Sequence, residues 1–255
     1  MKVVAKLAGG SHLYGLNTPE SDYDERYVYL HDSIDEIIGL GKNEFIDHRN
    51  GETDSFGYEF RNFLVSLRKT NTQAMEILFA PDESFTELHP LFKEVRKNRF
   101  NLIDPKQYFN SLRGYMYGER RLANGERQGK LGGKRKEQLD KYGFSPKNFV
   151  QLFRLAECGI ALFNNHEYPV NISKYNPTLH TWLMELKTNP GKFNKDELNK
   201  LVDEKDEILL KTYEFYDKYC MPGNRLHFDN NKANELIFNA YYPMLGKLHA
   251  INNGL

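Results

Sequence analysis

The 255-residue chain has only two cysteines and one tryptophan. Cys158 and Cys220 stand far apart, without Cys-x-x-Cys or Cys/His ligand spacing, so a zinc site has little support and both are expected to be reduced core thiols. The chain also lacks any run of about 18 apolar residues, and its first eight residues are too short and too charged for a secretory leader. We therefore expect a soluble, cytoplasmic protein with no membrane segment.

An excess of charge of either sign is also missing. Basic and acidic residues number 35 each, so the net charge of zero gives no overall attraction to nucleic acid or to an anionic membrane. Any such preference must be local. Hydrophobic residues make up 40% of the chain and aromatic residues 13%, which is ample material for buried cores and excludes a disordered protein.

Strand-like runs and turns fill the first hundred residues. The sequence predicts strands over residues 2–8, 22–30, 44–49 and 53–58, with Asn50-Gly51 as a hairpin turn between the last two. Phe60, Phe63, Leu64 and Leu67 recur at helical spacing and predict a helix over about 59–69.

After Asp104-Pro105 the strand signals disappear, and long stretches with helical periodicity follow. The sequence therefore predicts an α+β protein of two domains. Residues 1–104 would form a mixed sheet with helices, and residues 105–255 an all-helical domain. The sequence does not indicate an oligomeric state.

The most informative stretch is Gly10-Ser11-His12-Leu13-Tyr14-Gly15, followed by Ser21-Asp22-Tyr23-Asp24-Glu25-Arg26. Residues two apart in a strand point to the same face, so Asp22 and Asp24 are predicted to present their carboxylates together. Two converging carboxylates repel each other and need a cation. Mg²⁺, with Mn²⁺ as a substitute, suits hard oxygen ligands and completes its shell with phosphate and water.

Gly10-Ser11 is predicted to end a strand and open a helix, where backbone N–H groups and the helix dipole favour an anionic phosphate. The Ser11 hydroxyl can donate one more hydrogen bond to it. Arg26 either contacts a phosphate or neutralises the carboxylates as a structural partner. Gly10, Ser11 and Arg26 are therefore candidate nucleotide-binding residues.

Nucleotidyl transfer requires a further carboxylate to place a second metal at the attacking hydroxyl. Asp54 is the candidate, because it lies on a predicted strand that could run beside the Asp22/Asp24 strand. Glu59 is the competitor, although an acidic residue at the start of a helix is already explained by the helix dipole.

These motifs resemble a known family. Gly-Ser, the Asp-x-Asp with a following Arg, and the later Tyr58-Glu59-Phe60-Arg61-Asn62-Phe63-Leu64 look like the bacterial and phage nucleotidyltransferases of the polymerase β superfamily that are associated with RNA-repair ligases. Residues 71–81 and Tyr142-Gly143-Phe144-Ser145-Pro146-Lys147 are also similar to that family. The resemblance spans roughly residues 7–160.

The resemblance implies a polymerase β-like catalytic domain at residues 1–104 and a helical domain that closes over the nucleotide. It implies that Asp22, Asp24 and Asp54 are metal ligands and catalytic residues, and that Ser11 and Lys147 face phosphates. The predicted reaction is Mg²⁺-dependent transfer of a nucleoside monophosphate from a nucleoside triphosphate to a hydroxyl acceptor, with release of pyrophosphate.

The acceptor stays open between an RNA or tRNA end and a protein or small-molecule hydroxyl, and a non-catalytic nucleotide- or RNA-binding protein is the other alternative. Residues 113–136 hold eight basic and two acidic residues. Such a run is most often solvated surface, but it could also clamp a triphosphate or a nucleic-acid acceptor.

Overall fold

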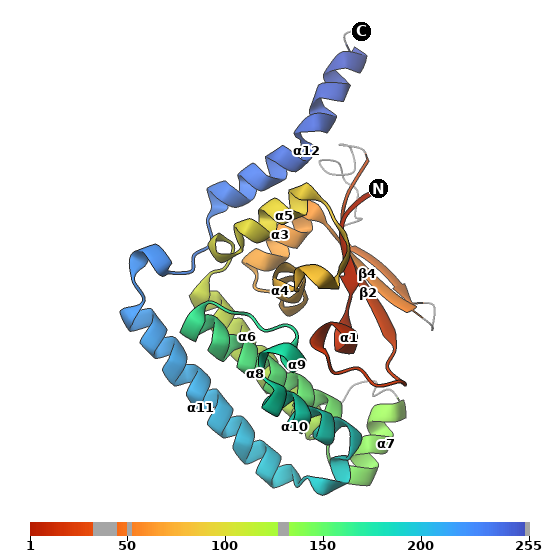
Figure 1. Ribbon diagram of the computed structural model, residues 1–255, viewed down its shortest axis with the longest axis vertical. Helices are drawn as coiled ribbons and strands as arrows, with labels where there is room; N and C mark the ends of the chain where they lie inside the picture. Colours follow the sequence, from red (N-terminus) through yellow and green to blue (C-terminus); the bar gives the residue numbers. More distant parts are fainter. Residues whose placement is uncertain (33–44, 50–52, 127–132, 253–255) are drawn as a thin grey trace. The chain divides into compact units, whose positions relative to one another are not determined.

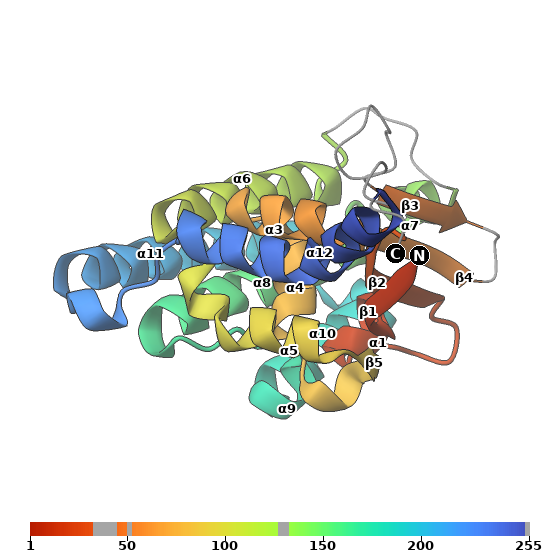
Figure 2. The ribbon, with the colours of Figure 1, turned by 90° about the horizontal axis from the view of Figure 1, so that it is seen from above.

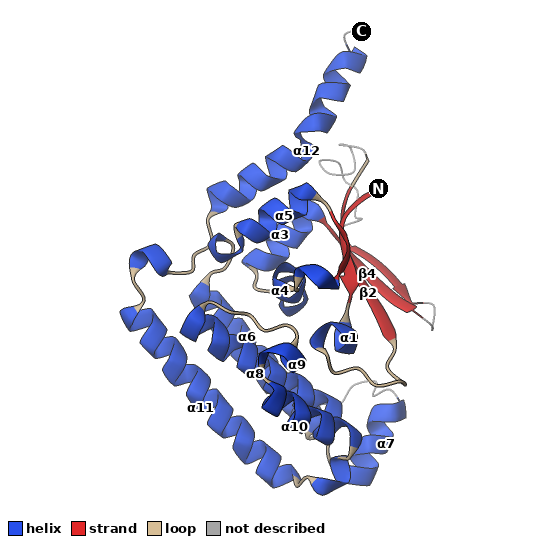
Figure 3. Cartoon of the chain, in the orientation of Figure 1, coloured by secondary structure: helices blue, strands red, loops and turns tan. Residues whose placement is uncertain are grey.

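The computed structural model describes residues 1–32, 45–49, 53–126 and 133–252 (Figure 1). The chain divides into two compact units. The first comprises Met1–Pro105 together with Leu226–Leu255, and the second comprises Lys106–Arg225. All the strands found in the described residues lie in the first unit, whereas the second is helical (Figure 3). The predicted α+β class is confirmed.

The first unit is built on a five-stranded mixed sheet with strand order β3-β4-β2-β1-β5. Its strands are β1 (Lys2–Ala8), β2 (Tyr23–Leu30), β3 (Phe45–Arg49), β4 (Thr53–Glu59) and β5 (Phe85–Leu88). Only β2 and β4 pair in parallel, and the other neighbours are antiparallel. The predicted pairing of residues 44–49 with 53–58 is confirmed by the β3–β4 ladder, while Asn50-Gly51 falls outside the described residues.

The helices of the first unit are α1 (Gly10–Tyr14), α3 (Phe60–Arg68), α4 (Thr72–Phe79), α5 (Pro90–Lys97) and α12 (Asn230–Asn252), with 3₁₀ turns at Asp82–Ser84 and Arg99–Asn101. The predicted helix over 59–69 is confirmed as α3, whose N-cap is Glu59. Its buried face is Phe60, Phe63, Leu64 and Leu67, as the spacing predicts. α4 ends at Phe79, just before Pro81, which cannot continue a helix.

One face of the sheet forms the core with these helices. Along β2 and β4, Val28 pairs in register with Tyr58, and both side chains are buried. The Tyr58 ring packs edge-on against Phe63 of α3, with ring centroids 5.8 Å apart. Phe63 in turn contacts Phe92 of α5. The helix-covered face of the sheet is therefore the face that carries Val28 and Tyr58.

α12 belongs to the same unit although it lies at the other end of the chain. It packs against α3 and α5, as Figure 2 shows. The segment that leads into it pairs with the first hundred residues through an isolated bridge between Leu102 and Phe228. The predicted helical domain of residues 105–255 therefore needs correction at its C-terminal end, because the segment from Leu226 belongs to the first unit, where Leu236 and Ala240 of α12 are buried.

The second unit is helical in its described part. Its helices are α6 (Pro105–Ala123), α7 (Gly133–Tyr142), α8 (Pro146–Asn165), α9 (Ile172–Tyr175), α10 (Pro177–Thr188) and α11 (Lys195–Tyr219), with 3₁₀ turns at Pro190–Lys192 and Pro222–Asn224. α8 is the most buried of them. A Cβ at Gly159 would lie 2.3 Å from Leu112 and 2.9 Å from Leu209, so α6, α8 and α11 meet at this glycine.

Among the described helices, none combines the length and apolar character needed to cross a membrane.

Candidate active site

The predicted Gly-Ser element folds as expected, with β1 ending at Ala8 and α1 starting at Gly10. The Gly9 N–H donates to the Asp24 carbonyl oxygen at 2.7 Å, which fixes the strand-to-helix turn against β2. Gly10 has a φ of +56°, and Gly15 closes α1 with a φ of +70°. Both angles lie in the left-handed region that glycine adopts without a steric penalty.

Gly10 also lies directly against the Asp24 carboxylate. A Cβ added at Gly10 would be 2.3 Å from Asp24 Oδ2, and one at Gly9 would be 2.8 Å from Arg26 Cγ. Because the two glycines have no side chains, there is room for the side chains of Asp24 and Arg26. The structure thus brings the Gly-Ser turn and the Asp-x-Asp strand into contact.

Asp24 and Asp54 are direct neighbours across the parallel β2–β4 pair. The register runs without a shift from Tyr23 opposite Thr53 to Tyr29 opposite Glu59. Because side chains alternate along a strand, Asp24 and Asp54 point to the same face of the sheet. That face is also the one that carries Arg26, Val28 and Tyr58. Two carboxylates side by side repel each other, which favours a bound cation between them.

Asp22 lies one residue before β2 and is exposed. The turn that leads to it is closed by two hydrogen bonds of 2.9 Å between Thr18 and Ser21: Thr18 N–H donates to Ser21 Oγ, and Ser21 N–H donates to the Thr18 carbonyl. The structure therefore places Asp22 just before the strand rather than within it.

Glu59, the alternative third carboxylate, lies elsewhere. It is five residues after Asp54 on an unshifted strand, so it points to the opposite face. Its side chain caps α3 by accepting from the N–H groups of Arg61 and Asn62, each at 2.9 Å. It also accepts a short hydrogen bond from the Tyr241 hydroxyl. Burial, together with Glu59, raises the pKa of Tyr241, which keeps this hydroxyl protonated as a donor.

These contacts assign Glu59 a structural role, and a variant can check it. We expect Glu59→Ala to destabilise the protein by about 1–3 kcal/mol, because it removes a helix cap and leaves a buried hydroxyl without its acceptor. Catalytic activity per folded molecule should stay near the wild-type level. Chemical denaturation and an activity assay on the same preparation would measure the two effects. If fully folded Glu59→Ala lost its activity, Glu59 would be a catalytic carboxylate after all.

Arg26 is the cation of the site. Its Nη2 lies 3.8 Å from Asp24 Oδ1, and its Nη1 donates to the Glu25 carbonyl oxygen at 2.8 Å. Both side chains of the Arg26–Asp24 pair are only partly exposed. The guanidinium thus sits beside the carboxylates, where it can neutralise Asp24 or meet a phosphate.

Asp24 and Asp54 are donors of the kind that Mg²⁺ accepts. In the part of the chain that the structure describes, no three His, Cys, Asp or Glu side chains are close enough to hold a metal ion by themselves. Mg²⁺ is commonly held by one or two carboxylates, with substrate phosphates and water completing its shell. Asp24 and Asp54 supply such a pair, whereas the structure does not bring Asp22 together with them as a third ligand.

The remaining predicted residue, Lys147, is exposed in the first turn of α8, in the second unit. Its neighbour Ser145 is the N-cap residue of α8, and the Ser145 hydroxyl donates to Asn148 Oδ1 at 2.7 Å. The role of Lys147 stays a prediction that rests on the family resemblance.

Two arginines of the basic segment turn out to be neutralised within the second unit. Arg113 of α6 donates twice to Asp206 of α11, at 2.8 and 2.6 Å. Arg120 donates to Asp203 at 2.5 Å and to Asn199 Oδ1 at 2.8 Å. These contacts join α6 to α11, so they serve the packing of the helical unit.

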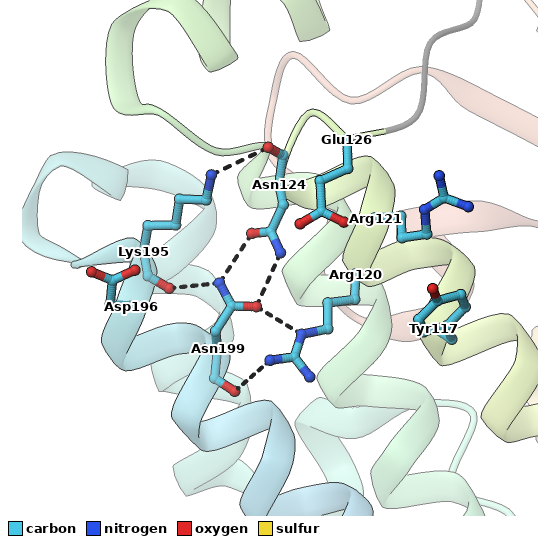
Figure 4. A pocket seen from close by; sticks show the side chains of 8 residues that line it. All are labelled: Tyr117, Arg120, Arg121, Asn124, Glu126, Lys195, Asp196 and Asn199. Atoms are coloured by element: carbon cyan, nitrogen blue, oxygen red, sulfur yellow. Dashed lines mark hydrogen bonds between the residues drawn. The ribbon is translucent and has the colours of Figure 1, made fainter.

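An open cleft of about 450 Å³ lies beside these contacts (Figure 4). Its lining residues are Tyr117, Arg120, Arg121, Asn124, Glu126, Lys195, Asp196 and Asn199. Asn124 and Asn199 bond to each other through their side-chain amides, and Lys195 Nζ donates to the Asn124 carbonyl at 3.2 Å. At the rim, the exposed Arg121 guanidinium lies 6.0 Å from the centre of the exposed Tyr117 ring. The sequence places Arg121 in the basic segment and Tyr117 close to it, and the structure shows that the two side chains lie together.

A mixed sheet that carries a Gly-Ser helix and aspartates in register on one face is the arrangement expected of a polymerase β-like nucleotidyltransferase. A family model described as "RNA repair pathway DNA polymerase beta family" matches residues 1–131, just over half of the chain. The chain therefore belongs to this polymerase β-like RNA-repair family.

One curated relative is an uncharacterized 38.9 kDa protein from the nrdC-mobD intergenic region of Enterobacteria phage T4. It is 29% identical to this chain over 125 residues, which cover 44% of this chain and 37% of the phage protein. The match thus spans well under half of that relative.

Proposed function

We propose that the protein transfers a nucleoside monophosphate from a nucleoside triphosphate to the terminal hydroxyl of an RNA, in the cytoplasm, with Mg²⁺ as its cofactor. The observation that carries this proposal is the pairing of Asp24 with Asp54 across β2 and β4, directly against Gly10. At this site the carboxylate oxygens, which are hard ligands, lie close to the backbone at Gly10. Such an arrangement suits a metal-bound triphosphate.

Each residue has a part in the proposed reaction. Asp24 and Asp54 would hold Mg²⁺ together with Asp22, and Asp54 would also orient the acceptor hydroxyl and accept its proton. The hydroxyl oxygen forms a bond to the α-phosphorus, and the bond between that phosphorus and the bridging α,β-oxygen breaks. Pyrophosphate leaves with the bond electrons. Bound Mg²⁺ supplies Lewis-acid stabilisation of the charge that develops on the phosphate oxygens.

Ser11, Gly10 and Arg26 are proposed to hold the triphosphate. The Ser11 side chain is half-buried at the start of α1, and Arg26 stands beside Asp24. An arginine near the metal-binding carboxylates can exchange its long 3.8 Å contact with Asp24 for a shorter one to a phosphate oxygen.

RNA is favoured as the acceptor by the family to which the chain belongs and by the Tyr117–Arg121 pair. An exposed aromatic ring beside an exposed guanidinium can stack a base and bind a phosphate in a sequence-tolerant way. Transfer to a protein hydroxyl uses the same carboxylates, so the experiment must separate these acceptors.

The test is incubation of the purified protein with each α-³²P-labelled nucleoside triphosphate, Mg²⁺ or Mn²⁺, and separate pools of RNA and protein. We expect label in the RNA pool, one pyrophosphate released for each nucleotide added, and no transfer after chelation with EDTA. Label in protein alone would replace the RNA acceptor by a protein hydroxyl. Nucleotide binding without label in either pool would indicate a non-catalytic binding protein.

A further inference from the structure

α1, the helix that carries Gly10 and Ser11, is too short to be stable by itself. It has five residues, little more than one turn, and a helix of that length depends on its contacts with the rest of the protein. Leu13 of α1 and the following Leu16 are buried, which holds the helix near the core. Buried leucines fix a helix less precisely in rotation than a directional hydrogen bond does.

Tyr14 supplies such a hydrogen bond at the end of α1. Its hydroxyl donates to Oε2 of Glu76 at 2.7 Å, across 62 positions of sequence. Glu76 lies in the middle of α4 and is 4% exposed, among the buried residues Ala74, Met75 and Ile77. Burying a carboxylate in apolar surroundings is costly, so a glutamate here needs a reason beyond packing.

α4 is itself fixed to the sheet, so Glu76 is a firm anchor. Asn71, the N-cap of α4, accepts from the Ala74 N–H and from the Tyr58 hydroxyl, each at 3.1 Å. Tyr58 stands on β4, four residues after Asp54 and on the same face of the sheet. Burial raises the pKa of Tyr58, so its hydroxyl stays protonated and donates.

We propose that Tyr14 and Glu76 form a positioning pair that sets the rotation of α1 and thereby places Gly10 and Ser11 against Asp24. The inference rests on the proposed function, in which these two residues hold the triphosphate. Ser11 is three residues before Tyr14, about one helical turn, so rotation of α1 at Tyr14 moves the Ser11 hydroxyl with it. A hydrogen bond to a carboxylate is stronger than one between neutral groups, which suits an anchor.

The decisive variant is Tyr14→Phe, which removes the hydroxyl and keeps the ring. We expect KM for the nucleoside triphosphate to rise about tenfold, with kcat changed much less, because the displaced groups bind substrate and do not react. The affinity for a non-hydrolysable α,β-methylene triphosphate should fall by a similar factor. Amide hydrogen exchange should become faster in α1.

Tyr241→Phe is the matched control. It also removes one tyrosine hydroxyl that donates to a buried glutamate of the first unit, but that glutamate is Glu59, which caps α3 and not α1. Both variants should lower Tm to a similar extent, whereas only Tyr14→Phe should raise KM and quicken exchange in α1. A purely structural role for Tyr14 would make the two variants behave alike, and that result would overturn the proposal.

Variants of Glu76 provide a second test of the pair. Glu76→Gln keeps an acceptor oxygen for Tyr14 and should retain most of the nucleotide affinity, whereas Glu76→Ala should lose it as Tyr14→Phe does. If the wild type bound nucleotide without transferring it, the proposed reaction would fail while the affinity measurements still tested the pair. Unchanged exchange in α1 of folded Tyr14→Phe would refute the pair even in the absence of any nucleotide.

Discussion

Asp24→Asn is expected to reduce nucleotidyl transfer by about a thousandfold, the scale found when a group that stabilises transition-state charge is removed. Asp24 lies next to the other main groups of the site. It pairs with Asp54 across the sheet, lies against Gly10, and has Arg26 beside it. An asparagine at this position keeps the size of the side chain and loses the negative charge that holds a cation.

The fold should survive this substitution. Removing one of two neighbouring like charges relieves repulsion, and the Arg26 contact that is lost is long, at 3.8 Å. Tm of the metal-free protein should therefore stay the same or rise slightly. Ligand binding to the folded state raises Tm, so wild-type protein should be stabilised by Mg²⁺ with nucleoside triphosphate. Asp24→Asn should lose most of that stabilisation.

Glu25→Gln is the matched control on the same strand. Glu25 is the next residue of β2, points to the opposite face, and forms an ion pair of 3.0 Å with Lys6. Its removal costs at most about 1 kcal/mol, as is usual for a partly exposed pair. Equal losses of transfer in Glu25→Gln and Asp24→Asn would show that the carboxylate face has no special role. Asp22→Asn and Asp54→Asn should both resemble Asp24→Asn.

The parts of this site that were predictable from the sequence are the local ones. Alternation along residues 22–26 and the Gly-Ser turn depend on neighbours within a few positions, and the structure places β2 and α1 accordingly. α3 was predictable for the same reason, since its apolar stripe repeats at helical spacing. The proposal that the Asp54 strand could run beside the Asp24 strand is confirmed by the β2–β4 ladder.

The register of that ladder was not predictable. Nothing local tells whether Asp54 or Glu59 faces Asp24, because a shift of one residue exchanges the two faces of a strand. The choice depends on contacts distant in sequence, such as the hydrogen bond from Tyr241 to Glu59 across 182 positions. The return of α12 to the first unit was missed for the same reason.

The free charge of the basic segment, residues 113–136, was also not predictable from the sequence. From composition, Arg113 and Arg120 counted as free positive charges, but Asp206 and Asp203 neutralise them from a helix that lies 93 and 83 residues further along the chain. Charge along a sequence therefore overestimated the surface available to a nucleic acid. The Tyr117–Arg121 pair is the part of that surface on which the RNA proposal depends.

Gly10→Ala should lower transfer by about a hundredfold, although it changes no polar atom. The added Cβ would lie 2.3 Å from Asp24 Oδ2, a distance that requires the carboxylate or the α1 turn to move. Displacement of reacting groups by about 1 Å is enough to lower a rate about a hundredfold. Alanine at a φ of +56° adds backbone strain of about 1–2 kcal/mol.

Gly143→Ala separates the strain from the clash. Gly143 has a φ of +77°, so alanine there carries a similar backbone penalty, but its Cβ would meet no atom within 4 Å. Both variants should lose similar stability on denaturation, and only Gly10→Ala should lose transfer and the affinity for nucleoside triphosphate. Because the two substitutions match in backbone strain, any difference between them reports the space that Gly10 leaves for the Asp24 carboxylate. If folded Gly10→Ala transferred nucleotide at the wild-type rate, contact between the Gly-Ser turn and Asp24 would not be needed for catalysis.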